Sequence, residues 1–497
     1  MPSFEEFIKQ IGLEEYPFST FTTENELGKE ETLFIKPNDY SPIVQSFNQQ
    51  NTIILIGDRG TGKTAILLDF ERKLTPNNSL FCSIDNFVAL PISFKPIDFY
   101  KFLLSNLSIT LFQKLSDEVN RINKLKKEEK VLLSYLLKNF VPLVSKRLLK
   151  EKIEKIQVPW YKRALRRIFN RGRGVLNYSA SIGVKFIDEY IAQHFKGMPT
   201  LGESSELKNF FPELPLTIDV EFNDVEIGYQ LLNDTLGVIT KLGYSRIVVI
   251  MDKIDEDSRL ENNGEAIADF IVPLLTDNKL LLNKKLQLIV SMWSTPFNYL
   301  LEHVRTQKHY CPKLNWTHDD LAKALNKRLN IFSNGKVKDY RMLFEEQFAT
   351  QDFTTLLDLA NSNPRDLWHL FDKLLRCQYK INPEMNVIEV KSFKPGIEDF
   401  VTGFNYFEYY PRKQNAKSNS MDFYSYTAHL LKLDREVFTR NQLNEKAGTG
   451  SSTQNYVIGM ESIGLVEKVG QESGGTTYRI KDPKVIYALK NNIKVEK

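Results

Sequence analysis

The stretch that most constrains the fold is TIILIGDRGTGKTA, residues 52–65. A β-branched run ends at Ile56, a glycine-rich turn ends in Lys63-Thr64, and an apolar helical pattern follows. This is the G-x-x-x-x-G-K-[ST] pattern in its strand–loop–helix context. The glycines let backbone N–H groups close on phosphate oxygens, and the N-terminus of the helix adds a partial positive charge. The chain is therefore predicted to bind a nucleotide phosphate within an α/β fold.

Phosphate chemistry gives the loop residues their expected roles. Lys63 would reach the β- and γ-phosphates, and the hydroxyl of Thr64 would ligate Mg²⁺. ATP and Mg²⁺ are thus the expected cofactors. A glycine-rich turn that matches the pattern by chance is the alternative, and the flanking strand and helix count against it. The residues expected to contact the nucleotide are Gly57, Asp58, Arg59, Gly60, Thr61, Gly62, Lys63, Thr64 and Ala65.

A second strand pattern, IVVIMDKIDED at 247–257, carries more charge than a core strand should. Its apolar half is typical of a strand buried on both faces, as in a parallel sheet. A P-loop requires a carboxylate on a second strand to hold Mg²⁺, and Asp252 is the candidate. Asp255 or Glu256 would orient and deprotonate the attacking water, and both stay candidates. Asp257 is interpreted as a capping or solvated acid, and a plain polar loop is the alternative for the whole cluster.

Composition places the chain among ordinary globular proteins. Its 497 residues predict two to four domains, and a net charge of +4 excludes a global polyelectrolyte. Three widely spaced cysteines favour a reducing compartment, and the six histidines form no metal-ligand spacing with them. The start lacks the basic and then apolar run of a signal peptide, and no apolar stretch reaches the roughly 20 residues that span a bilayer. A cytoplasmic protein without a membrane span is expected.

The D-K-I-D-E of residues 252–256 resembles the D-x-h-D-E form of NACHT-like STAND ATPases, where h is an apolar residue. Standard AAA+ proteins instead place Glu directly after the Asp, where this chain has Lys253. The N-terminal GLEEYPFSTFTTENE, residues 12–26, also resembles the start of a bacterial P-loop ATPase family often called Sll-type. The resemblance implies an ATPase of the AAA+/STAND superfamily that holds nucleotide and hydrolyses it slowly.

Later motifs follow the order of the same superfamily. LQLIVSMWSTP at 286–296 resembles a buried strand whose polar end, including Ser294, is the sensor-1 position. Arg305 stands where origin-recognition-type AAA+ proteins carry an arginine finger. The resemblance implies that Ser294 contacts the nucleotide and that Arg305 acts on the site of a neighbouring subunit. A solvated helical face is the common alternative for such an arginine.

The next two motifs resemble a helical lid. LNWTHDDLAKALNKRL, residues 314–329, resembles its first helix. NSNPRDLWHLFDKLL, residues 361–375, resembles the sensor-2 helix, with Asn in place of the usual small residue. Pro364 would start this helix, and Arg365 would point from its first turn at the γ-phosphate. The resemblance covers residues 40–380, apart from a large insertion.

The insertion, residues 95–215, has apolar positions at three- and four-residue spacing and is predicted to be mostly helical. Within it, residues 121–173 hold 17 lysines and arginines against four glutamates. The densest part, VPWYKRALRRIFNRGRGVLNY at 158–178, interleaves arginines with aromatic residues. The three interpretations are contact with a nucleic acid, contact with an anionic membrane surface, and a merely solvated helical face.

Residues 422–480 are predicted to form three helices and a hairpin with a Gly-rich tip, an order that resembles a winged helix-turn-helix. The third helix, 452–463, contains no Lys or Arg, whereas a major-groove reader normally brings basic residues. Packing against the ATPase or a partner is therefore favoured over DNA binding. The expected domains are a lead-in (1–45), a P-loop core (46–312), a helical lid (313–380), a linker (381–420) and a winged helix (421–497).

Together these features predict an ATPase switch in which the nucleotide state controls homo-oligomerisation and recruitment of a protein partner. Arg365 in cis and Arg305 in trans would complete the positive charge around the phosphates. The family resemblance adds a role in bacterial anti-phage defence. One alternative is a DNA-binding initiator or loader ATPase that uses the basic insertion and the winged helix. Another is a nucleotide-binding scaffold without turnover.

Overall fold

A four-stranded sheet with strand order β1-β4-β3-β2 is formed by strands between residues 53 and 293. The computed structural model describes residues 2–21, 30–74, 78–141, 224–410, 420–472 and 475–497. The apolar, β-branched strands are buried along nearly their whole length, and β2 pairs with β3 in parallel. The predicted α/β P-loop NTPase fold is confirmed. The strands are β1 Ile53–Gly57, β2 Ser79–Ile84, β3 Arg246–Met251 and β4 Gln287–Trp293.

The chain divides into two compact units by its internal contacts. The P-loop, Asp252, the expected lid and the C-terminal residues all belong to the first unit. The candidate site can therefore be described within one compact body, and the domain boundaries given above stay predictions. The first unit comprises Met1–Arg72, Asp252–Val272 and Val290–Lys497, and the second comprises Lys73–Met251 and Pro273–Ile289.

In the first unit, the P-loop connects β1 to the helix α4, Lys63–Leu74, and residues 310–314 run beside β1. The amides of Ile54 and Ile56 donate to the carbonyl oxygens of Tyr310 and Pro312, each at 2.9 Å. This parallel segment supports the strand that leads into the P-loop. The other helices of this part are α1 Phe4–Gln10, α2 Glu30–Leu33, α3 Tyr40–Asn48, α12 Gly264–Leu275 and α14 Ser294–Leu300.

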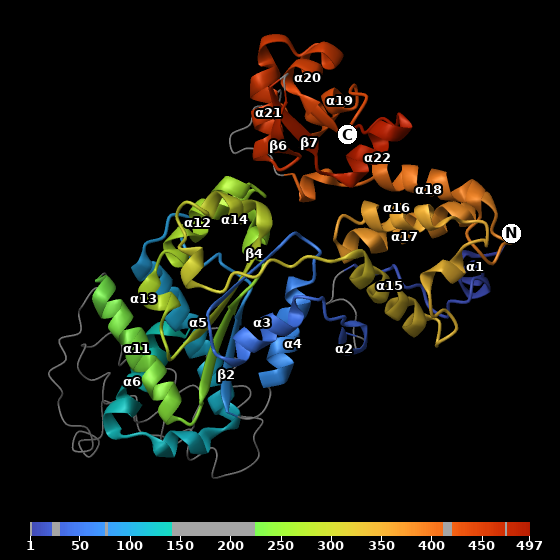
Figure 1. The fold of residues 1–497 in the computed structure, drawn as a ribbon. Helices are drawn as coiled ribbons and strands as arrows, with labels where there is room; N and C mark the ends of the chain where they lie inside the picture. Colours follow the sequence, from blue (N-terminus) through green and yellow to red (C-terminus); the bar gives the residue numbers. More distant parts are fainter. Residues whose placement is uncertain (1, 22–29, 75–77, 142–223, 411–419, 473–474) are drawn as a thin grey trace, which may run out of the picture. The chain divides into compact units, whose positions relative to one another are not determined.

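Four helices form the lid region (Figure 1), and capping residues set where two of them begin. Thr317 and Asp320 form a capping box at the start of α15. Asn363 caps α17, and Pro364 occupies its first position, where a missing N–H costs no hydrogen bond. The four helices are α15 His318–Phe332, α16 Thr350–Leu359, α17 Pro364–Ile381 and α18 Val390–Thr402.

The segment expected as a linker, residues 381–420, contains the helix α18. Its buried side chains, among them Ile397 and Phe400, belong to the same apolar core as the lid. Gly396 lets α18 approach α17 closely, because an added Cβ would lie 2.9 Å from Leu374 Cδ2. The prolines that suggested a connection did not prevent this helix, since Pro395 lies inside it.

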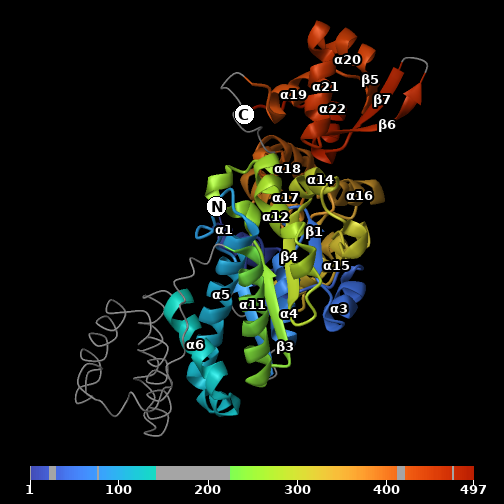
Figure 2. The same cartoon turned by 90° about the vertical axis from the view of Figure 1, so that its left-hand side faces the viewer.

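The C-terminal residues place three helices beside an antiparallel sheet of order β5-β7-β6. A further helix, α22, follows β7 and contacts α16 and α18 (Figure 2). The three expected helices and the hairpin are present, and α22 is an addition that the sequence patterns did not predict. The elements are α19 Phe423–Leu430, β5 Val437–Thr439, α20 Arg440–Ala447, α21 Thr453–Ser462, β6 Val466–Glu472, β7 Gly475–Ile480 and α22 Pro483–Asn491.

The second unit packs the helices α5 and α11 together and α6 against α5 (Figure 2). Arg121, at the start of the basic tract, contacts residues of this same unit. Arg121 donates to the carbonyl oxygens of Leu242 and Gly243 at 3.4 and 3.2 Å and pairs with Glu118. The densest basic part, 158–178, lies outside the described residues. The helices are α5 Pro96–Asp117, α6 Lys127–Phe140, α11 Val225–Lys241 and α13 Asn278–Leu281.

Among the described residues, no helix combines the length and the hydrophobicity that a bilayer span requires.

Candidate nucleotide site

The P-loop closes around its own lysine. Lys63 Nζ donates to the carbonyl oxygens of Gly57 and Asp58 at 2.8 and 3.0 Å. Gly60 and Gly62 have φ angles of +85° and +84°, which residues with a side chain rarely adopt. A Cβ on Gly57 would lie 2.6 Å from Thr61 Oγ1. The glycines of the motif therefore meet steric requirements of this turn.

Thr64 and Asp252 meet beside the loop. Thr64 Oγ1 donates to Asp252 Oδ2 at 2.7 Å, although the two residues are 188 positions apart. A hydroxyl and a carboxylate are the oxygen ligands that Mg²⁺ prefers in proteins. The two residues predicted to share a metal ion are thus close enough to do so. Burial lowers the pKa of the neighbouring Lys63, and the carboxylates of Asp255 and Asp252 oppose that shift.

The two candidate catalytic acids have different surroundings. Asp255 Oδ2 accepts a hydrogen bond from Arg59 Nε at 2.6 Å, and its carbonyl oxygen accepts one from Nη2 at 2.9 Å. Lys253, at φ +59°, makes the left-handed turn that leads from Asp252 to this ion pair. Among the described residues, no hydrogen bond or ion pair engages the carboxylate of Glu256. Burial raises the pKa of Glu256, and the charge of Asp255 adds to the rise.

The start of α17 contacts the tip of the P-loop. Asn363 Nδ2 donates to the Arg59 carbonyl oxygen at 2.6 Å, and Asn363 Oδ1 accepts from the Arg365 backbone N–H at 3.0 Å. A Cβ on Gly60 would lie 2.6 Å from Asn363 Oδ1 and 2.7 Å from Arg365 Cβ. Arg365 Nε is buried, and no described residue accepts a hydrogen bond from it. The Asn that replaces the small residue of the family pattern therefore both caps α17 and ties it to the loop.

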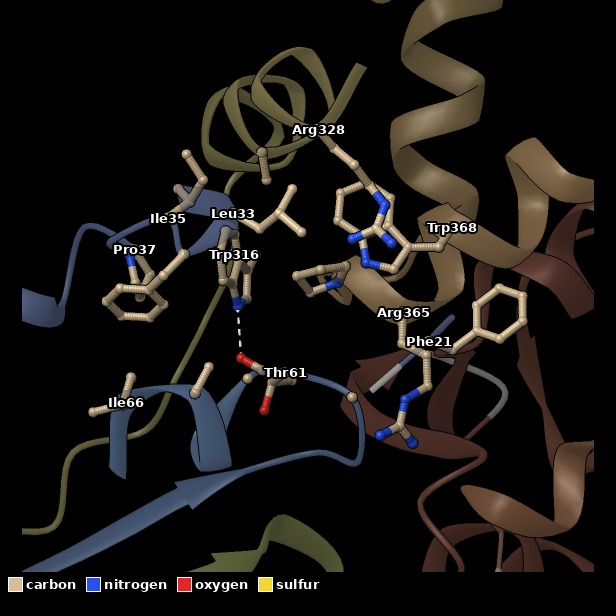
Figure 3. Close-up of a pocket in the computed structure, with 16 residues that line it drawn as sticks. Phe21, Leu33, Ile35, Pro37, Thr61, Ile66, Trp316, Arg328, Arg365 and Trp368 are labelled. Carbon is tan, nitrogen blue, oxygen red and sulfur yellow. Dashed lines mark hydrogen bonds between the residues drawn. The ribbon is translucent and has the colours of Figure 1, made fainter. Parts of the chain in front are cut away.

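A largely apolar pocket lies beside the loop (Figure 3). Trp316 forms part of its wall, and its Nε1 donates to the Thr61 carbonyl oxygen at 2.9 Å. Arg328 is buried on another side, where its Nε donates to the Pro17 carbonyl oxygen at 2.6 Å and its guanidinium lies over the Trp368 ring. Apolar walls with a few fixed polar groups are typical of small-molecule sites. The other walls include Phe21, Leu33, Ile35, Pro37, Ile66 and Ala324.

Two expected residues are not brought to this cluster. The strand β4 ends at Trp293, so Ser294 begins the helix α14 and is not the polar end of a strand. Pro296, in the first turn of α14, suits a helix start. Ser294 Oγ is buried without a hydrogen-bond partner among the described residues. Arg305 is exposed, and in the described chain no hydrogen bond or ion pair joins it to the P-loop.

Sequence reasoning missed Tyr409 entirely and gave Trp316 no role at the loop. The Tyr409 hydroxyl lies 3.3 Å from the Arg59 carbonyl oxygen and accepts from Asn363 Nδ2 at 2.7 Å. Tyr409 follows α18 in the segment expected as a linker, so no pattern marked it. Trp316 belonged to the lid motif, but only the fold places its indole N–H against Thr61.

No family model matches the chain, and no curated protein matches its sequence. Among solved structures, a Walker-type ATPase of Pyrococcus abyssi aligns at 13% identity with a TM-score of 0.39, covering 96% of this chain and 100% of that one. Cdc6p from Pyrobaculum aerophilum aligns at 10% identity with a TM-score of 0.31, covering 96% of this chain and 98% of that one.

Proposed function

We propose that this chain is a Mg²⁺-dependent ATPase of the AAA+/STAND type that works as a molecular switch. The observation that carries the proposal is the contact of Thr64 Oγ1 with Asp252 Oδ2, at 2.7 Å. A hydroxyl that follows a glycine-rich loop and a carboxylate that follows a buried strand converge there, as the metal site of a P-loop NTPase requires.

Each reacting group has a candidate in the site. Thr64 and Asp252 would hold Mg²⁺, which when bound neutralises phosphate charge. Lys63 would exchange the loop carbonyl oxygens for oxygens of the β- and γ-phosphates. Glu256 would accept the proton of the attacking water, because none of the described residues forms an ion pair with its carboxylate and its raised pKa makes it a stronger base. Asp255 is already paired with the loop and would hold the acidic turn in place.

Arg365 supports a triphosphate as the ligand. A buried guanidinium N–H without a hydrogen-bond partner is costly, and Arg365 Nε, at the edge of the pocket, has no partner among the described residues. An oxygen of the γ-phosphate would satisfy it with a charge-assisted hydrogen bond. The apolar walls around Trp316 would then take the base, while the loop takes the phosphates (Figure 3).

The switch part of the proposal is supported by the contact between the loop and the lid. Asn363 bonds the tip of the P-loop, so a ligand that moves the loop also moves α17. Arg305 is exposed, as a residue that acts on the site of a neighbouring subunit in a homo-oligomer has to be.

The C-terminal residues, 421–497, support a protein partner. Their element order agrees with a winged helix-turn-helix. The exposed residues of α21 are Gln454, Asn455, Ile458 and Glu461, and none of them is basic. A face with an exposed Ile and no cation suits a protein better than DNA, so the initiator or loader function is not favoured. The assignment to anti-phage defence rests on the sequence resemblance alone.

Nucleotide binding and phosphate release, each measured with and without Mg²⁺, test the proposal. The wild type is expected to bind and hydrolyse ATP only with Mg²⁺. Lys63→Ala should abolish phosphate release, and Asp252→Asn should raise the Mg²⁺ concentration that phosphate release requires, because it weakens metal binding. Lys323→Ala is the matched control, because Lys323 is an exposed lysine of α15 that pairs with Asp319. Phosphate release by Lys63→Ala at the wild-type rate would refute the assignment.

A further inference from the structure

A buried ion pair joins the C-terminal helix to the lid. Lys484 Nζ, from the first turn of α22, lies 2.8 Å from Asp366 Oδ2, from the first turn of α17. Both side chains are 1% exposed. Taking two charges out of water costs solvation free energy, and well-packed apolar side chains often stabilise a fold equally well. Stability alone is therefore a poor explanation for this pair.

The surroundings of the pair suit its charges. The Lys484 ammonium lies 4.3 Å from the centre of the Phe404 ring, which is a favourable contact for a desolvated cation. Asp482 caps α22 by accepting from the Lys484 backbone N–H at 2.8 Å. Its other oxygen accepts from the Tyr410 hydroxyl at 2.7 Å. The carboxylates of Asp366 and Asp482 raise the pKa of Lys484 against the effect of burial, whereas burial raises the pKa of Asp366 against the charge of Lys484.

Tyr409 connects this pair with the P-loop. Its hydroxyl donates to Asp366 Oδ1 at 2.5 Å and accepts from Asn363 Nδ2 at 2.7 Å. Asn363 Nδ2 also donates to the Arg59 carbonyl oxygen. A continuous series of polar contacts thus leads from Lys484 in the last helix, through the start of the lid helix, to the backbone of the phosphate loop.

Asp366 and Arg365 are consecutive residues in the first turn of α17. Arg365 lines the pocket beside the P-loop, and Asp366 binds α22 through Lys484. A helical turn is rigid, so displacing one of these residues displaces the other. Neither Lys484 nor Tyr409 lines the pocket.

We propose that Lys484 and Tyr409 are positioning residues that couple the docking of α22 to nucleotide binding. The docked helix holds Arg365 and the tip of the P-loop in the arrangement that binds nucleotide. This inference rests on the proposed nucleotide function. It makes the C-terminal helix a regulatory element of the site, since any partner that pulls α22 away weakens nucleotide binding.

The network is suited to two states, docked and released. A partly broken arrangement leaves a charge in apolar surroundings without its partner, which costs more than either a complete network or full hydration. Thermodynamic linkage between helix docking and nucleotide binding then sets the direction in which each changes the other. If the docked helix favours nucleotide binding, nucleotide must favour docking by the same factor, and such factors are typically about 5–150.

Hydrogen exchange of the full chain, with and without Mg²⁺ and a non-hydrolysable ATP analogue, tests the coupling. In the wild type, amides of both the P-loop and α22 are expected to exchange more slowly with nucleotide. Tyr409→Phe removes a single oxygen, so the loop should still respond while the response of α22 falls at least threefold. Tyr406→Phe is the matched control and should keep both responses, because that buried hydroxyl donates to the Val401 carbonyl oxygen.

A second pair of variants measures the reciprocal effect on affinity. Lys484→Met should raise the Kd of the analogue about tenfold. Lys490→Met removes an exposed lysine of the same helix, one that pairs with Glu436, and should leave the Kd unchanged. Because Tyr409→Phe is the milder change, it tests the coupling even where Lys484→Met destabilises the chain.

The outcomes separate the two proposals. Protection of the P-loop without any response of α22 in the wild type overturns the coupling and leaves the nucleotide function standing. Equal Kd values for Lys484→Met and Lys490→Met also overturn the coupling. Absence of P-loop protection in the wild type overturns the nucleotide function, and the coupling falls with it.

Discussion

Gly60→Ala is expected to separate the lid from the tip of the P-loop. Gly60 has a φ of +85°, and an added Cβ would lie 2.6 Å from Asn363 Oδ1 and 2.7 Å from Arg365 Cβ. Gly335, which follows α15, has a φ of +86°, and an added Cβ there would meet no atom within 4 Å. The two Gly→Ala variants impose the same backbone strain, so the difference between them measures the contact of loop and lid.

The size of that difference follows from the hydrogen bonds at stake. An alanine forced into the left-handed region costs about 1–2 kcal/mol at either position. At Gly60 the new methyl group also displaces the Asn363 amide, which loses its bonds to the Arg59 carbonyl oxygen and the Arg365 N–H. Each of these bonds contributes about 1 kcal/mol. Gly60→Ala should therefore lower the free energy of unfolding by about 2 kcal/mol more than Gly335→Ala does.

Denaturant unfolding followed by tryptophan fluorescence is a suitable assay, because Trp293, Trp316 and Trp368 all lie in the first unit. Measuring without nucleotide keeps phosphate binding out of the comparison. If the two variants lose the same stability, to within about 0.5 kcal/mol, the direct contact of loop and lid is refuted. Such a result would also refute the role of Asn363 in capping α17 and binding it to the P-loop.

Glu256→Gln should slow phosphate release about 10²- to 10⁴-fold with little loss of stability. The wild-type rate should rise with pH through a pKa above the ordinary glutamate value, because only the ionised carboxylate accepts a proton, and a variant that keeps this rise contradicts the assigned base. Asp255→Asn breaks the ion pair with Arg59 and should lower the free energy of unfolding by about 2 kcal/mol. It should slow phosphate release less than Glu256→Gln does. Both quantities are measured on both variants, and these roles are rejected if Asp255→Asn loses more rate and Glu256→Gln loses more stability. Arg365→Met should weaken ATP binding more than ADP binding in titration calorimetry, and equal losses for the two nucleotides would count against its place at the γ-phosphate.

The α/β class and the P-loop could be predicted from the chain because both depend on local patterns. A buried strand is visible as a run of apolar, β-branched residues. The left-handed turns at Gly60 and Gly62 favour glycine, so the glycines in the sequence indicate where these turns lie. The start of α17 was predictable for the same reason, since proline is favoured at the first position of a helix, where Pro364 stands.

The division of labour between the two acids depended on contacts that no local pattern contains. Arg59 pairs with Asp255 across 196 residues, and Lys484 meets Asp366 across 118. Hydrophobic periodicity and capping act over three or four positions, whereas ion pairing follows from which segments the folded backbone brings together. For that reason the glycines and the candidate metal carboxylate were evident in the primary structure, while the pairing of Asp255 with Arg59 and of Lys484 with Asp366 emerged only on folding.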